Sequence, residues 1–182
     1  MAIHITYFVH GTTTDNEKNI SSGWSDVELS EKGIQQSIIL KSQIGDKKFD
    51  VVFCSDLKRA VESAQLTFAE TTPIIADQRL RECNYGTYNG KSSTIVEPLQ
   101  EKMITEKFPE GESYENVKSR IADFLEFLKR DYGEKNIAIV AHKAPQLALD
   151  VLLKGNTWEQ AFGNDWRKTH SWQPGWEYVL EE

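Results

Sequence analysis

The sequence contains no apolar run long enough to cross a membrane or to serve as a secretory signal peptide. It has only two cysteines, Cys54 and Cys83, and their spacing fits neither a metal site nor a disulfide framework. These absences favour a cytoplasmic protein whose thiols stay reduced. We therefore expect no membrane partner.

Positive charge is also scarce, and the chain carries a formal net charge of -7. This balance argues against nucleic acid as a partner but allows an anionic small molecule, because a local group of cations can outweigh the overall field. The sequence lacks the His-Glu-x-x-His, Asp-x-Asp and glycine-rich Walker-type motifs. We therefore expect neither a metal ion nor a cofactor.

The 182 residues include no linker rich in proline, glycine or serine. A hydrophobic fraction of 39% and a charged fraction of 27% are typical of a soluble globular protein. The length suits one sizeable hydrophobic core. We therefore expect a single domain over residues 1–182.

Apolar segments and helical patterns alternate along the chain. The segments expected to form strands are 3–8, 50–54, 136–141, a short edge strand at 73–76 and a last strand at 176–180. Such alternation predicts an α/β three-layer sandwich with a mostly parallel central sheet, covered by helices on both faces.

The helices are predicted from caps and from apolar residues at helical spacing. One runs from Ser30 to about Ile44, with Ile34, Ile38 and Ile39 on one side. The pair Ser55/Asp56 is expected to cap a second helix, and Ser113 to start a third. A fourth follows residue 142 and ends before Gly155. The tail tryptophans, Trp158, Trp166, Trp172 and Trp176, are expected to pack in the core or a lid.

Two histidines follow buried strands of the predicted sheet. His10, with Gly11 behind it, comes after the first strand, and His142 closes the 136–141 strand. Arg59 lies in the first turn of the helix after the second strand. Ligands of such sheets bind outside the carboxyl ends of the strands. We therefore expect a phosphate site, with the two imidazoles within about 10 Å of each other.

A series of short motifs lies in a fixed order along residues 3–153. The segments are Val9-His10-Gly11-Thr12-Thr13 with Asn16, Gly23-Trp24-Ser25-Asp26, Leu29-Ser30-Glu31-Lys32-Gly33, Ser55-Asp56-Leu57-Lys58-Arg59-Ala60, Leu80-Arg81-Glu82 with Gly86 and Gly90, Gly111-Glu112-Ser113, and His142. In this order the chain resembles the histidine phosphatase superfamily, the phosphoglycerate mutase-like proteins. Each motif alone is weak, but the collinear set is specific.

The resemblance implies a metal-free phosphatase that hydrolyses a small phosphorylated molecule, with mutase activity less favoured. In that family's chemistry His10 attacks phosphorus and forms a phosphohistidine. Arg59 and protonated His142 stabilise the charge on the equatorial oxygens, and Glu82 acts as general acid and then base. The residues expected to bind the phosphate are Gly11, Thr12, Thr13, Asn16 and Lys143.

The first motif departs from the family at three places. Val9 stands where the family has an arginine, Thr12 where it has Glu or Gln, and Lys143 where a small residue follows the second histidine. Loss of such a guanidinium should cost about 3 kcal/mol of charge stabilisation, as for one oxyanion donor. Lys143 could compensate as a compact cation.

Two alternatives to a fully active histidine phosphatase can be compared with the sequence. A catalytically weak or inactive member could bind a phosphorylated ligand or a protein, and Val9 favours this interpretation. A cysteine-dependent phosphatase is excluded, because the spacing from Cys54 to Arg59 is one residue too short for its loop. The sequence leaves open the oligomeric state, a homodimer included.

Overall fold

A central sheet of five strands organises the molecule in the order β4-β3-β6-β1-β7. The computed structural model describes residues 2–169 and 175–181, so Trp172 lies outside the described residues. The strands are β1 (Ala2–Val9), β3 (Val51–Cys54), β4 (Ile74–Ala76), β6 (Asn136–Ala141) and β7 (Trp176–Glu181). The first four run parallel, whereas β7 pairs antiparallel with β1.

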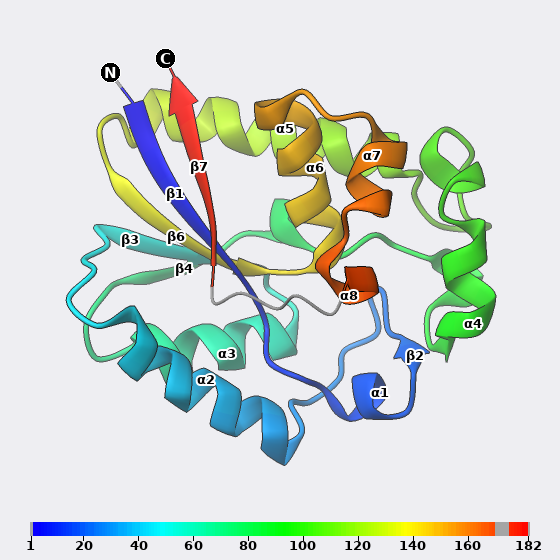
Figure 1. Cartoon of the computed structure of the whole chain (residues 1–182), viewed down its shortest axis with the longest axis horizontal. Helices are drawn as coiled ribbons and strands as arrows, with labels where there is room; N and C mark the ends of the chain where they lie inside the picture. Colours follow the sequence, from blue (N-terminus) through cyan, green and yellow to red (C-terminus); the bar gives the residue numbers. More distant parts are fainter. Residues whose placement is uncertain (1, 170–174, 182) are drawn as a thin grey trace.

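Helices cover both faces of this sheet, as Figure 1 shows. On one side lie α2 (Glu31–Ile44) and α3 (Lys58–Phe68). On the other lie α5 (Tyr114–Asp131), α6 (Lys143–Lys154) and α7 (Trp158–Gly163). The predicted α/β three-layer sandwich with a mostly parallel sheet is therefore confirmed.

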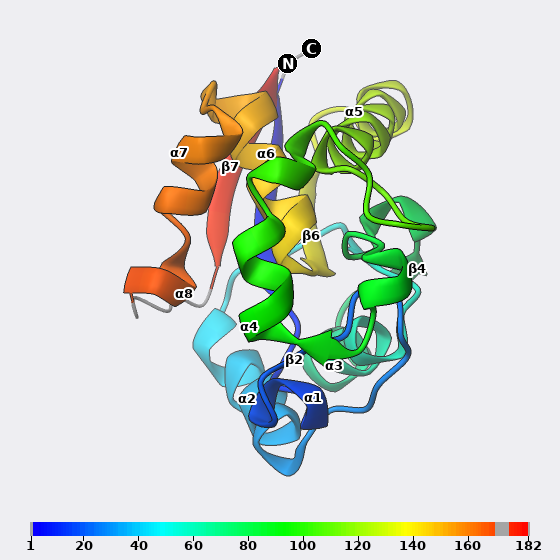
Figure 2. The ribbon, with the colours of Figure 1, turned by 90° about the vertical axis from the view of Figure 1, so that its right-hand side faces the viewer.

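The shorter elements gather beyond the edge where the parallel strands end (Figure 2). They are α1 (Thr14–Glu17), α4 (Ser93–Val96), α8 (Trp166–Thr169), the two-stranded sheet of β2 (Ile20–Ser21) and β5 (Lys91–Ser92), and the 3-10 turns η1 (Gln78–Leu80), η2 (Gly86–Tyr88), η3 (Glu97–Leu99) and η4 (Lys102–Ile104). A rim of irregular segments thus surrounds the strand ends, which is where ligands of such sheets bind.

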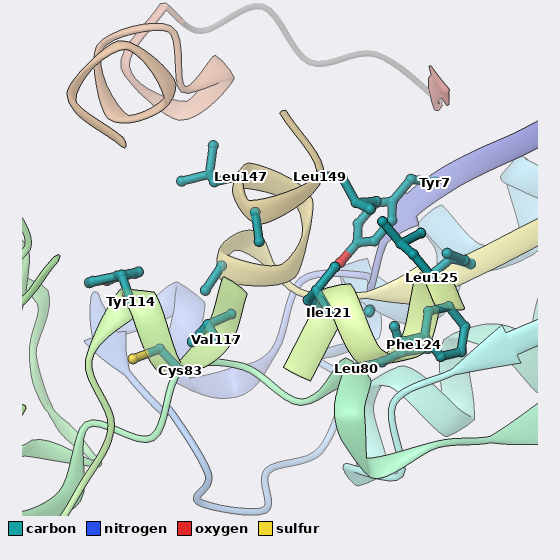
Figure 3. Close-up of a cluster of buried hydrophobic side chains, with 14 of the residues drawn as sticks. Tyr7, Leu80, Cys83, Tyr114, Val117, Ile121, Phe124, Leu125, Leu147 and Leu149 are labelled. Atoms are coloured by element: carbon teal, nitrogen blue, oxygen red, sulfur yellow. The ribbon is translucent and has the colours of Figure 1, made fainter. Parts of the chain in front are cut away.

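Side chains of β1 alternate between the two core layers. Ile3, Ile5 and Tyr7 belong to the larger cluster with α5 and α6, part of which is drawn in Figure 3. Phe8 belongs to the smaller cluster with α3, where its ring packs 5.7 Å from that of Phe68. Because strand side chains point alternately to opposite faces, a central strand needs apolar residues on both. The 3–8 run supplies them.

The predicted caps hold at three of the four main helices. The hydroxyl of Ser30 accepts from the N–H of Gly33, and Ser113 caps α5 through a reciprocal pair of bonds with Asn116. Helix α6 ends at Gly155, whose φ of 70° favours glycine. Helix α3 differs: its N-cap is Leu57, without a side-chain cap bond.

Two sequence-based expectations need correction for physical reasons. Asp56 is not available as a cap for α3, because both its oxygens accept from Arg81 at 2.7 Å. Ile34, Ile38 and Ile39 of α2 lie on its exposed side, and Ile39 is 53% exposed, whereas Ile44 packs against the smaller core cluster. Gly33 and Ser37 are buried instead, since small residues let α2 approach its neighbours closely.

Neither cysteine forms a disulfide, and both are buried as free thiols. No helix in the part of the chain that the structure describes has the length and apolar character needed to cross a membrane.

Candidate active site

The register between β1 and β6 brings the two histidines together. Val9 and Ala141 are paired at the carboxyl ends of these strands, so the next residues, His10 and His142, emerge side by side. The N–H of His10 donates to the carbonyl of Ala141 at 3.0 Å. The ring centroids of the two imidazoles are 5.1 Å apart. The expected convergence is therefore confirmed, at a distance that one phosphoryl group can bridge.

The imidazole of His10 is held in one tautomer. Its Nδ1 lies 2.7 Å from the carbonyl oxygen of Gly11, which can only accept, so Nδ1 carries the hydrogen. The lone pair is therefore on Nε2. Burial and the neighbouring guanidinium of Arg59 lower the pKa of His10 to about 3. The ring is thus neutral at ordinary pH.

The backbone of His142 is fixed by a buried tyrosine. The hydroxyl of Tyr7 donates to the carbonyl of His142 at 2.6 Å and accepts from its N–H at 3.0 Å. The side chain of His142 is fully buried, and within the described residues neither ring nitrogen has a hydrogen-bond partner. Burial, Arg59 and His10 lower its pKa well below the ordinary value. A buried ring whose two nitrogens form no hydrogen bond in the described part of the chain can still bond to a ligand.

Arg59 is presented by the first turn of α3 and is only 2% exposed. Its Nη1 donates to the carbonyl of Ser25 at 3.0 Å, and its Nη2 donates to that of Gly23 at 2.7 Å. These bonds explain the Gly-Trp-Ser-Asp segment physically, because it orients the guanidinium at the cavity wall. An arginine so buried keeps its charge and creates a fixed positive site.

Glu82 lies at the start of α6 in space, although it is far from it in sequence. Its Oε1 accepts from the N–H of Cys83 at 2.8 Å and from the N–H of Ala144 at 3.0 Å. Its carbonyl accepts from the indole of Trp24 at 2.7 Å and from Arg120 at 2.9 Å. The carboxylate is therefore held in place from both its side chain and its backbone.

The residues of the loop after His10 that were predicted to bind phosphate fall into two groups. Thr12 and Asn16 line the cavity. Gly11 and Thr13 do not: the N–H of Gly11 donates to Ser63 at 3.0 Å, and the buried hydroxyl of Thr13 accepts from Asn16 as the cap of α1. The latter two residues hold the loop in shape.

A cavity of about 530 Å³ opens at this edge. Its lining residues are Val9, His10, Thr12, Asn16, Asn19, Ile20, Ser21, Ser22, Gly23, Lys32, Gln36, Arg59, Glu82, Tyr85, Ser93, Glu97, Gln100, Lys143, Trp166 and Arg167. Of the predicted catalytic set, His142 alone lies behind this lining, with its ring against His10. Lys143 reaches the cavity, but its ammonium forms an ion pair with Asp165 at 2.9 Å. No group of three or more His, Cys, Asp and Glu side chains that could hold a metal occurs among the described residues.

Sequence reasoning missed two cations of this cavity, Lys32 of α2 and Arg167 of α8. The charge of Arg167 contributes to lowering the pKa of both His10 and His142, after the larger effects of burial and Arg59. Nothing around Asp165-Trp166-Arg167 resembles a motif, and the tail was expected only to pack. The one available signal was an arginine two residues after an aspartate, with a tryptophan between them.

Comparison with known proteins assigns a family to this arrangement. The family model of the histidine phosphatase superfamily (branch 1) matches residues 7–173. The chain is 32% identical over 146 residues to a 2,3-bisphosphoglycerate-dependent phosphoglycerate mutase of Cytophaga hutchinsonii, covering 73% of this chain and 68% of that protein. It is 27% identical over 158 residues to phosphoserine phosphatase 1 of Hydrogenobacter thermophilus, covering 80% and 74%.

A solved structure agrees with these relatives. The alpha-ribazole phosphatase from Shigella flexneri superimposes with a TM-score of 0.77 at 25% identity, covering 90% of this chain and 84% of that one. This alpha-ribazole phosphatase thus shares the fold of the chain. The chain belongs to the histidine phosphatase superfamily.

Proposed function

We propose that the protein is a phosphatase that hydrolyses a small phosphomonoester through a phosphohistidine on His10. The observation that carries this proposal is the pair of imidazoles 5.1 Å apart, of which His10 lines a cavity that Arg59 also lines. An imidazole nucleophile, a second imidazole, a buried guanidinium and a carboxylate can together carry out phosphoryl transfer.

In the first step, Nε2 of neutral His10 attacks phosphorus, a bond forms between nitrogen and phosphorus, and the bond to the leaving oxygen breaks. The bond between Nδ1 and the carbonyl of Gly11 supports this role, because it stabilises the positive charge that develops on the ring. Water then attacks the phosphohistidine and releases inorganic phosphate, which restores the free imidazole.

Arg59 and His142 stabilise the charge on the phosphoryl oxygens in this scheme. The lowered pKa of His142 means that the empty site holds a neutral ring at ordinary pH. A bound phosphoryl dianion raises that pKa, since an opposite charge nearby favours the protonated form. Substrate binding is therefore coupled to uptake of a proton, which completes the cationic site only when it is needed.

Glu82 transfers protons to the leaving oxygen and from the attacking water. Because Oε1 already accepts two backbone N–H bonds, the mobile proton belongs on Oε2. The same two bonds fix the carboxyl group against the start of α6, so its position does not depend on the substrate.

The other residues that line the cavity support a small polar leaving group. Most of them have amide, hydroxyl or charged side chains, among them Asn16, Asn19, Ser21, Lys32, Gln36, Ser93, Glu97 and Gln100. A volume of about 530 Å³ suits a metabolite-sized molecule. Hydrolysis of a hydrophilic ester is therefore favoured over that of an apolar one. A cytoplasmic location is part of the same proposal, supported by the two free thiols.

Phosphohistidine trapping tests the proposal. Purified protein is given a ³²P-labelled small phosphomonoester, quenched in alkali and analysed for an acid-labile label. We expect the label and turnover in the wild type, in the presence of a chelator, and in His4→Ala, whose histidine lies exposed on β1. Both should be absent from His10→Ala. Turnover that survives in His10→Ala would refute the assignment.

Val9 favours one second candidate, a weak or inactive member that binds a phosphorylated ligand or a protein. Valine lines the cavity where the family has a cation. This candidate predicts phosphate binding in the wild type without label on His10 in the trapping experiment. Labelling of His10 excludes it.

A further inference from the structure

Two cations of the cavity share one buried carboxylate. Asp165, whose side chain is 1% exposed, pairs with the ammonium of Lys143 at 2.9 Å and with Nη1 of Arg167 at 3.2 Å. It also accepts the backbone N–H of Arg167 at 3.1 Å. Although burial alone would raise it, the two cations hold the pKa of Asp165 below its ordinary value. The group of three residues therefore carries a net positive charge.

Lys143 and Arg167 differ in the donors that they can present to an oxyanion. The ammonium of Lys143 is a point charge on an 11% exposed side chain, directed at Asp165. Arg167 is 30% exposed and lines the cavity with a planar group of five N–H donors, and its side-chain bond to Asp165 is made by Nη1. Arg167 is therefore the better candidate to bind an oxyanion while it keeps its own partner.

The segment that carries Arg167 is anchored on both sides. Before it, α7 packs Trp158 and Phe162 into the core. After it, β7 pairs with β1, with Trp176 opposite Tyr7. The ring of Trp166 lies 6.0 Å from that of Trp176. The guanidinium is thus presented from a short helix fixed against the sheet rather than from an isolated tail.

A phosphoryl group bound at this site could accept bonds from a second guanidinium. A phosphoryl group in the transition state carries charge on three equatorial oxygens, and Arg59 can approach it from one side only. Val9 supplies no charge on the β1 side. We propose that Arg167 binds the phosphoryl oxygens as the second guanidinium of the site and so replaces the arginine absent at residue 9. This inference rests on the proposed function for its substrate, but it also predicts binding of free phosphate.

Affinity for inorganic phosphate and turnover of a phosphomonoester with an uncharged leaving group test this role together. Arg167→Ala should weaken phosphate binding and lower kcat/KM, each by at least about tenfold. Arg167→Lys should recover part of both losses, because it keeps the charge without the planar fork. The control is Lys168→Ala, an exposed cation of the same helix, which should change either value by less than about twofold. Thermal unfolding of each variant, with Arg167→Lys as the milder change, separates a lost contact from a lost fold.

Several results would overturn the assignment. Unchanged phosphate affinity and turnover in Arg167→Ala would do so, as would an equal loss in Lys168→Ala, which would indicate only a general field. A loss confined to esters whose leaving group carries a carboxylate would assign Arg167 to the leaving group instead. Phosphate affinity that depends on Arg167, without turnover or label on His10, would support the inference and refute the proposed function. A wild type that binds no phosphate and turns over no ester would refute both.

Discussion

Gly33 does not line the cavity, but Gly33→Ala is expected to disturb the candidate active site. Gly33 lies in the first turn of α2, and a Cβ added there would come 2.0 Å from the carbonyl oxygen of Thr12 and 2.8 Å from its nitrogen. Both atoms belong to backbone, so they cannot rotate away. That carbonyl accepts from the N–H and hydroxyl of Ser30 at 2.9 and 3.1 Å. Relief of the clash must therefore move the loop that follows His10.

The substitution has two opposing effects on the free energy of unfolding. Alanine is favoured over glycine inside a helix by about 1 kcal/mol. Overpacking against a rigid neighbour costs about 1–3 kcal/mol, and loss of the bonds to Ser30 adds to it. We expect a net loss of about 1–3 kcal/mol in the free energy of unfolding, or about 2–12 °C in Tm at this chain length. A shift of His10 by about 1 Å should lower kcat/KM by about tenfold to a hundredfold.

Gly163→Ala is the matched control for this change. Gly163 also lies in a helix, at the end of α7, and nothing lies within 4 Å of its added Cβ. We expect this variant to be as stable as the wild type or up to about 1 kcal/mol more stable, with unchanged turnover. Urea unfolding and steady-state kinetics measure both variants. If Gly33→Ala behaves like Gly163→Ala, the contact between α2 and the loop does not position His10.

Two further predictions follow from the buried groups. Tyr7→Phe leaves the N–H of His142 without its partner, so it should cost about 1–3 kcal/mol of stability and reduce turnover. The control is Tyr132→Phe, whose ring packs in the same core and which should cost less than about 0.5 kcal/mol. Equal losses in urea unfolding would contradict this role of Tyr7. Stability should fall as the pH drops from about 6.5 towards 3, because the unfolded state then binds protons that the buried imidazoles, facing Arg59 and Arg167, do not. Each imidazole contributes up to about 1.4 kcal/mol of stability per pH unit. His142→Gln should therefore flatten the plot of stability against pH, whereas His4→Gln should not. Parallel plots for wild type and His142→Gln would rule out this cause.

Much of the fold follows from local patterns. The apolar runs at 3–8 and 136–141 became β1 and β6, and Ser30, Ser113 and Gly155 mark helix ends as predicted. The same patterns explain the convergence of the two histidines, because parallel strands in register must end together. These features depend on few residues that lie close in sequence.

What the sequence did not predict depends on contacts between distant segments. Asp56 has a side chain typical of a helix cap, but its carboxylate pairs with Arg81 from a distant segment. The outward direction of Ile34, Ile38 and Ile39 accompanies a contact on the other side of α2, where the hydroxyl of Thr67 on α3 donates to the carbonyl of Ser37. Arg167 lies between α7, which packs in the core, and β7, which pairs with β1. No local spacing encodes these contacts.

The position of β1 between β6 and β7 has a consequence for the order of events during synthesis. Tyr7 and His142, which bond to each other, are 135 residues apart in the chain. Of these three strands β1 is made first, so both of its edges stay unpaired until its two neighbours have been made. The pair of His10 and His142 cannot form before β6 is complete, so this pair is a late product of folding.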